Sequence, residues 1–140
     1  MNYKFFDHTA DVLFEAEGKS LGELFEAAAL ATEETQVDLK DVKQKIKKQV
    51  RLQNEKIDML LFDFLQELIF LKDARLLLFS GIKVSVKEKN KKYFLESVLK
   101  GEKIDPKRHN LKVDVKAVTL HRFEVKPTKK GWFALVILDI

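Results

Sequence analysis

Residues 57–73 carry apolar side chains on more than one side of the helix that their spacing predicts. One broad stripe comprises Ile57, Leu60, Leu61, Phe64, Leu65, Leu68 and Ile69, and beyond it lie Phe62, Phe70 and Leu71. A helix at the surface of a domain needs only one apolar stripe, whereas a helix that is apolar on several sides must be enclosed. Only a narrow acidic strip is polar, formed by Asp58, Asp63, Gln66, Glu67 and Asp73. The rest of the chain must therefore cover this helix from more than one direction.

A second helix is predicted over residues 20–36. Ser20 and Glu23 have the spacing of a capping box, in which the hydroxyl accepts a backbone N–H and the carboxylate reaches back to the cap. Apolar residues then recur at helical spacing, at Leu21, Leu24, Phe25, Ala28 and Ala31 or Thr32. The pattern places Glu23, Glu26 and Glu33 on the outer side of an amphipathic helix that lies on a core.

Strands are predicted where the apolar period changes to two. The segments are residues 3–6, 12–16, 42–52, 82–86, 93–99, 113–125 and 132–138. Residues 88–92 are expected to turn a hairpin, residues 100–110 to form a long polar loop, and residues 126–131 to form a further turn. The segment 132–138 is apolar on both faces, so it is expected to be an interior strand. We expect one α+β domain over residues 1–140, with two helices packed on one mostly antiparallel sheet or a pair of sheets.

Composition excludes several classes of protein. The 140 residues include no Cys, which removes disulfide scaffolds, Cys-ligated zinc, iron–sulfur clusters and thiol nucleophiles. The apolar runs are far shorter than the ~20 residues of a membrane helix, and residues 1–7 have no export signal, so a cytoplasmic location is expected. The five glycines are too scattered for a P-loop or a Rossmann turn, and no Gly-x-Ser-x-Gly motif is present.

Charge is divided unevenly along the chain. Residues 1–38 carry nine acids and two bases, a net charge of −7. Because the whole chain has a net charge of +4, residues 39–140 have a net charge of +11. The lysines of residues 43–48 and 87–92 could meet RNA or an acidic partner. These lysines are not interleaved with aromatic residues or arginines. Sites on which RNA bases stack would favour such residues among the lysines. A solvated face is therefore the favoured interpretation, and RNA binding the alternative.

The segment Asp7-His-Thr-Ala-Asp11 gathers two carboxylates and an imidazole in five residues between two predicted strands. Such a loop can hold a metal or a reacting water. It can equally be structural, with Asp7 or Thr9 capping a turn and His8 donating to a nearby carbonyl group. The sequence leaves both interpretations open.

A second acidic group follows the last predicted strand, where Asp139 is followed by Ile140 and its α-carboxylate. If the loop that contains Asp11 lies beside this strand end, three carboxylates converge, and like charges so close need a cation or a proton between them. An all-oxygen set favours Ca²⁺, Mg²⁺ or Mn²⁺ over zinc. A zinc site formed by His8, His109 and His121 is a minor alternative, because their spacing does not support it.

Six blocks in order along the chain resemble the archease family. They are Asp7-His-Thr-Ala-Asp-Val12, Gly18-Lys-Ser-Leu-Gly-Glu-Leu-Phe25, Leu60-Leu-Phe-Asp-Phe-Leu-Gln-Glu-Leu-Ile-Phe-Leu71, Gly101-Glu-Lys-Ile-Asp-Pro-Lys-Arg-His109, Val115-Lys-Ala-Val-Thr-Leu-His121, and Gly131-Trp132 through Asp139-Ile140. Two positions depart from the family pattern: Leu120 stands where an aromatic residue is frequent, and Gln66 where Asn is common.

The resemblance implies a non-catalytic partner of the GTP-dependent tRNA-splicing RNA ligase, not an enzyme. Archeases promote guanylylation of that ligase's active-site histidine, support its turnover and broaden its nucleotide use, and a chaperone-like role toward tRNA-modifying methyltransferases is also proposed for the family. Its divalent cation site carries over to Asp11, Asp139 and the carboxylate of Ile140. Among divalent cations, Ca²⁺ is the expected cofactor.

Two other classes of function remain as alternatives. A small metal-dependent hydrolase would use Asp7, His8 and Asp11 to hold a cation and an activated water. A bare RNA-binding domain would use the lysines of residues 43–48 and 87–92. The sequence does not assign roles to His8, His109, Lys116 and His121, although a structural role is favoured for His121 on a strand, and it leaves the oligomeric state open.

Overall fold

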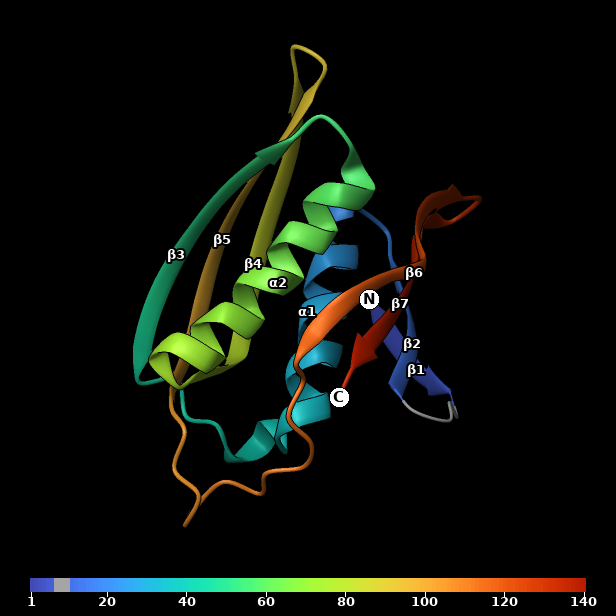
Figure 1. Ribbon diagram of the computed structural model, residues 1–140. Helices are drawn as coiled ribbons and strands as arrows, with labels where there is room; N and C mark the ends of the chain where they lie inside the picture. Colours follow the sequence, from blue (N-terminus) through green and yellow to red (C-terminus); the bar gives the residue numbers. More distant parts are fainter. Residues whose placement is uncertain (7–10) are drawn as a thin grey trace.

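The computed structural model describes residues 1–6 and 11–140, which form two β-sheets with two helices between them (Figure 1). The elements are β1 (Asn2–Phe6), β2 (Asp11–Gly18), α1 (Leu21–Gln36), the 3₁₀ helix η1 (Leu39–Asp41), β3 (Ile46–Asn54), α2 (Ile57–Arg75), β4 (Leu77–Lys89), β5 (Lys92–Lys103), β6 (Ala117–Thr128) and β7 (Gly131–Asp139). The expected single α+β arrangement with two helices is confirmed. No helix among the described residues is long and apolar enough to cross a membrane.

Every strand pairs antiparallel with its neighbours. One sheet has the order β1-β2-β7-β6 and the other the order β3-β5-β4. β7 lies between β2 and β6, which confirms the interior strand predicted from its apolar faces. The β2–β7 ladder runs from Asp11 opposite Asp139 at one end to Gly18 opposite Trp132 at the other. The two ends of this ladder form the two surfaces described below.

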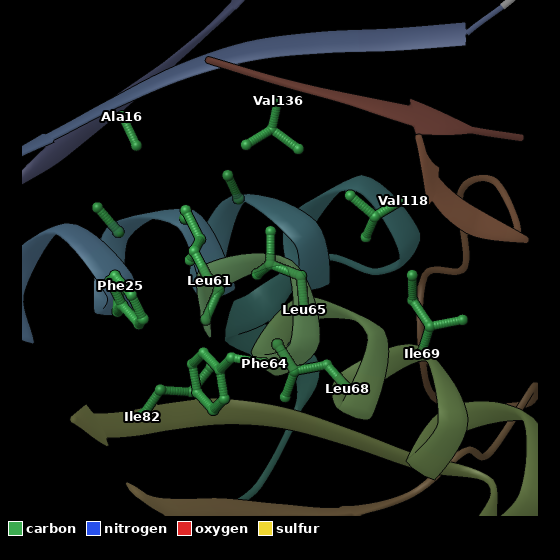
Figure 2. Packing of buried hydrophobic residues seen from close by; sticks show 14 of the residues in the cluster. Ala16, Phe25, Leu61, Phe64, Leu65, Leu68, Ile69, Ile82, Val118 and Val136 are labelled. Atoms are coloured by element: carbon green, nitrogen blue, oxygen red, sulfur yellow. The ribbon is translucent and has the colours of Figure 1, made fainter. Parts of the chain in front are cut away.

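The main core lies between the sheets and encloses both helices. Figure 2 shows Ala16 and Val136 of one sheet on one side of the helices and Ile82 of the other sheet on the opposite side. Phe25 of α1 stacks on Phe64 of α2 with ring centroids 6.3 Å apart, and both rings are fully buried. The prediction that α2 is covered from more than one direction is confirmed, although Phe70 on this helix remains 55% exposed.

The capping box of α1 is formed with one difference. The Ser20 hydroxyl accepts the Glu23 N–H at 3.2 Å, as predicted. The Glu23 carboxylate accepts the N–H of Lys19 at 3.4 Å, one residue before the predicted donor. Both bonds satisfy backbone donors at the start of the helix, so the motif correctly marks where α1 begins.

Three predicted loop boundaries are wrong. The β4–β5 turn is confined to Asn90 and Lys91, whose positive φ angles of 52° and 62° suit a tight hairpin turn. β5 continues through the first part of the predicted 100–110 loop, because residues 100–103 still pair with β4. Likewise β6 continues to Thr128, so the predicted 126–131 turn shrinks to Lys129 and Lys130. Pairing with a neighbouring strand keeps these polar residues extended.

Two predicted strands start late. Residues 42–45 precede β3, and Val42 instead packs in a small separate core with Val37 and Leu78. Residues 113–116 precede β6; within them Val113 is exposed while Val115 is buried in the main core. The alternating apolar residues of these two segments therefore lie in loops, where Val42 and Val115 are buried and Val113 is exposed.

Candidate functional site

Asp11 and Asp139 occupy facing positions at the end of the β2–β7 ladder. Residues directly opposite in an antiparallel pair have Cβ atoms about 5 Å apart on the same face of the sheet. Asp139 is exposed and Asp11 is partly buried. Two facing carboxylates repel each other, so this end of the sheet favours a cation between them. The predicted convergence of carboxylates depends on Asp11 lying beside the end of the last strand, and the structure meets this condition.

Ile140 follows directly on Asp139 and is held by its side chain. It is partly buried and packs against the main core. The carbonyl oxygen of Asp139 also accepts the N–H of Lys116 at 2.8 Å, which ties the end of β7 to the segment before β6. The backbone that carries Asp139 and Ile140 is therefore fixed on two sides.

A surface hollow of about 420 Å³ adjoins Asp11. Its lining comprises Phe5, Phe6, Asp11, Val12, Glu34, Thr35, Lys112 and Val113. Burial, assisted by Glu34, raises the pKa of Tyr3 to about 12, so this neighbouring hydroxyl stays protonated. Phe5 and Phe6 are each 40% exposed, so the acidic end of the sheet presents apolar surface beside its carboxylates.

Asp7 and His8 lie outside the described residues, so the hydrolase site predicted from Asp7, His8 and Asp11 stays a prediction. Within the described residues no group of three His, Cys, Asp or Glu side chains is placed to hold a metal ion. The carboxylate set predicted above has two such side chains, Asp11 and Asp139, and counts the α-carboxylate of Ile140 as its third member, so it stays a prediction.

His109 has a structural role, and its place in the predicted zinc site is wrong. Its side chain is buried; its Nδ1 accepts the N–H of Asp105 at 2.9 Å, and its Nε2 lies 2.9 Å from Glu102 Oε2. Accepting at Nδ1 requires the proton to be on Nε2, which then donates to the carboxylate. Neither nitrogen has a lone pair left for a metal. His121 is exposed on β6.

The polar cluster around Glu102 was not predicted, because the sequence placed this residue in a loop. The buried carboxylate also accepts from Arg108 Nη2 at 2.5 Å and from the N–H of Lys43 at 2.7 Å. The Arg108 guanidinium, with the His109 and Lys43 donors, lowers the pKa of Glu102 to about 2. The cluster joins the segment after β5 to the segment before β3.

Glu33 corrects the prediction that it lies on the outer side of α1. Its side chain is 0% exposed, because the second sheet covers that side of the helix. Oε2 accepts the N–H of Phe79 at 3.3 Å, and Oε1 finds no hydrogen-bond partner among the described residues. Burial raises the pKa of Glu33 to about 8, against the lowering effects of the Phe79 N–H and Lys72.

Lys72 of α2 is a further buried ionisable residue that was not predicted. Its ammonium donates to the Asp114 carboxylate and, at 2.9 Å, to the carbonyl oxygen of Val115, and it pairs with Asp73 at 2.6 Å. A lysine among the apolar residues of a predicted helix gave no sign of burial. Its partners come from the segment before β6, which sequence patterns do not place beside α2.

Comparison with known proteins gives one consistent result. The family model described as the Archease protein family matches residues 3–140. Protein archease of Pyrococcus furiosus is 35% identical over 99% of this chain and 98% of its own length, and that of Archaeoglobus fulgidus is 36% identical over both full chains.

Solved structures agree with the fold. The solution structure of protein 1598 of Methanobacterium thermoautotrophicum has a TM-score of 0.85 and 37% identity, covering 99% of this chain and 98% of that one. The crystal structure of a Thermotoga maritima protein described as an archease, possible chaperone, has a TM-score of 0.63 at 20% identity, covering 98% and 96%. The second likeness concerns the fold alone.

Proposed function

Because the chain belongs to the archease family, we propose that it is a non-catalytic accessory protein that activates a GTP-dependent tRNA-splicing RNA ligase. In this role it promotes guanylylation of the ligase's active-site histidine and supports repeated turnover, in the cytoplasm and on tRNA substrates. The observation that carries the proposal is the facing pair of Asp11 and Asp139. These are the two side chains that the family resemblance assigns to a functional site.

The site offers the oxygen ligands that hard divalent cations prefer, and we propose Ca²⁺ as the bound ion. Asp11, Asp139 and the α-carboxylate of Ile140 would hold the ion through oxygen atoms only. A bound cation supplies the positive charge that offsets the repulsion between the carboxylates. The chain's own contribution is to hold the carboxylates together through the β2–β7 ladder and the packing of Ile140.

We place the ligase contact at this same end of the sheet. Phe5 and Phe6 supply exposed apolar surface beside Asp11, and the adjoining hollow gives that surface a concave shape. Aromatic side chains are enriched at protein interfaces relative to the rest of a protein surface. In the proposed complex, the acidic pair lies close to the ligase's metal and nucleotide pocket while Phe5 and Phe6 pack against its surface.

The direct test is single-turnover guanylylation of a purified GTP-dependent RNA ligase from the same organism, with this protein at sub-stoichiometric level. Wild type is expected to stimulate the reaction, and folded Asp11→Ala and Asp139→Ala variants to lose the stimulation. Glu88→Ala, which removes an exposed acid near the β4–β5 turn, is the matched control and should behave as wild type. Absence of stimulation by wild type would overturn the proposed function. Full stimulation by both Asp variants would overturn the role of the acidic pair.

Cation binding gives a second, independent prediction. Asp139→Asn is expected to stabilise the protein in EDTA by about 0.5 kcal/mol, because it removes a facing like charge. The same variant is expected to lose the rise in melting temperature that Ca²⁺ gives to wild type. Differential scanning calorimetry with Ca²⁺ or EDTA measures both effects. An equal Ca²⁺-dependent rise in wild type and variant would place the cation elsewhere.

A chaperone-like modulator of tRNA-modifying methyltransferases is the alternative function. Its support is the family resemblance, which implies such a role as well; a Thermotoga maritima protein of the same fold is described as an archease, possible chaperone. Suppression of heat aggregation of a purified tRNA methyltransferase by this protein, with no effect on ligase guanylylation, would favour this alternative.

A further inference from the structure

The end of the β2–β7 ladder away from the acidic pair carries a second surface. There Gly18 faces Trp132, and a hollow of about 440 Å³ is lined by Met1, Asn2, Glu17, Gly18, Lys19, Thr128, Lys129, Lys130 and Trp132. Two separate segments supply its lysines: the β2–α1 junction gives Lys19, and the β6–β7 turn gives Lys129 and Lys130.

Gly131 brings these two segments together. Its φ of 150° lies in the region that favours glycine, and a Cβ at this position would meet the carbonyl oxygen of Gly18 and the backbone of Lys19. The β6–β7 turn can therefore press directly on the β2–α1 junction. The lysines of both segments surround one hollow as a consequence.

The net charge of the side chains that line this hollow is positive. Lys19, Lys129 and Lys130 are exposed, and among the described residues none of the three forms an ion pair within 4.0 Å. Glu17 is the single acidic side chain in the lining. Three free ammonium groups around a concave surface attract a ligand with several negative charges.

Trp132 gives this hollow an aromatic face. It is the one tryptophan of the chain, it is partly exposed, and it lines the hollow beside the three lysines. Sites for single-stranded nucleic acids combine aromatic rings, on which bases stack, with cations along the phosphate backbone. Within the sequence segments 43–48 and 87–92 no aromatic residue is interleaved with the lysines, whereas here one aromatic ring and three lysines line the same hollow.

We propose that this hollow binds single-stranded RNA, with one base stacked on Trp132 and the neighbouring phosphates paired with Lys19, Lys129 and Lys130. The site is independent of the ligase contact. Seven residue steps along β7 separate it from Asp139, or about 23 Å at a rise near 3.3 Å per residue. RNA held here and a partner at the acidic pair would therefore occupy opposite ends of one sheet without overlapping.

Intrinsic fluorescence tests the proposal directly, because the single tryptophan is in the site. Titration of the wild type with oligouridylate at low ionic strength is expected to quench Trp132 saturably. Because each phosphate contact with single-stranded nucleic acid contributes about 0.7 to the slope of log K against log salt, Lys129→Ala/Lys130→Ala should reduce the slope by about 1.4. Absence of saturable quenching in the wild type would overturn the proposal.

Three controls separate this site from general attraction to anions. Lys89→Ala/Lys92→Ala removes two exposed lysines that flank the β4–β5 turn and should leave binding unchanged. Trp132→Leu should weaken binding of fluorescein-labelled RNA, measured by anisotropy, by about 5- to 100-fold, and Trp132→Phe should weaken it less. Inorganic polyphosphate and polyaspartate, which have no bases, should bind more weakly than RNA. Equal losses in both double-lysine variants, or equal binding of polyaspartate, would overturn the proposal in favour of a general or acidic-protein contact.

Discussion

Replacing Glu33 with Gln is expected to stabilise the fold strongly at alkaline pH while changing its stability little near pH 5. Burial raises the pKa of Glu33 from 4.5 to about 8, so the folded state keeps the carboxyl protonated where the unfolded chain has already released the proton. Between these two values the folded state binds more protons, and the free energy of unfolding falls as the pH rises. A shift of this size corresponds to about 5 kcal/mol as an upper bound.

Urea unfolding of wild type and Glu33→Gln at about pH 5, 7 and 9 measures this effect. The stability difference should grow through this range and level off above the folded-state pKa of about 8. The Gln side chain keeps an acceptor for the N–H of Phe79, so the variant retains the hydrogen bond of the wild type. Glu88→Gln, at an exposed position, is the control and should show no such trend. A constant difference between Glu33→Gln and wild type would contradict the prediction.

Truncating Glu102 to Ala is expected to lower the free energy of unfolding at pH 7 by about 3 kcal/mol. Removal of the carboxylate leaves the buried Nε2–H of His109, the guanidinium of Arg108 and the N–H of Lys43 without their acceptor. Unsatisfied buried donors and unpaired charges cost far more than an exposed ion pair contributes. Urea unfolding measures the loss. Glu102→Gln keeps an acceptor but not the charge, so its free energy of unfolding should lie between those of wild type and Glu102→Ala. Asp105→Ala, at the exposed edge of the cluster, should lower the free energy of unfolding less than Glu102→Ala does.

Glu102 also predicts a pH response opposite to that of Glu33. Arg108 and the other donors lower its folded-state pKa to about 2, so the unfolded chain takes up protons first as the pH falls. Its stabilising contribution is therefore complete above the unfolded-state pKa near 4.5 and is lost between there and about pH 2. The free energy of unfolding of wild type and Glu102→Gln, measured below about pH 5, gives the contribution of Glu102. The same measurement at alkaline pH, on wild type and Glu33→Gln, gives the contribution of Glu33.

Apolar periodicity correctly predicts the helices and most strands, because the faces that an element buries follow from the spacing of apolar residues within a short stretch of sequence. It failed at strand ends, where the decision is made by pairing with a distant strand. Lys100 and Glu102 are polar and yet continue β5 against β4, whereas Val113 is apolar and yet exposed in a loop. The error on Glu33 has a related origin: its place on a helical wheel assumed one covered side, and the second sheet covers another.

The acidic pair was predictable in part. The sequence indicates that Asp139 follows a buried strand and that Asp11 directly precedes another strand, but it does not show that the two strands are neighbours. The order β1-β2-β7-β6 supplies this missing fact. Trp132 and the lysines near it were not selected from the sequence, because Lys19 and Lys129 meet only through the same pairing.

The β2–β7 ladder has a consequence for how the protein is made. β2 is made well before β7, and both helices and the whole second sheet lie between them in the sequence, so their pairing waits until β7 has left the ribosome. Contacts between distant segments also slow folding, because a long loop must close before they form. Asp11 and Asp139 become neighbours only when this final closure has occurred. A nascent chain that still lacks β7 therefore has neither end of the ladder assembled, and it cannot offer the acidic pair to a partner.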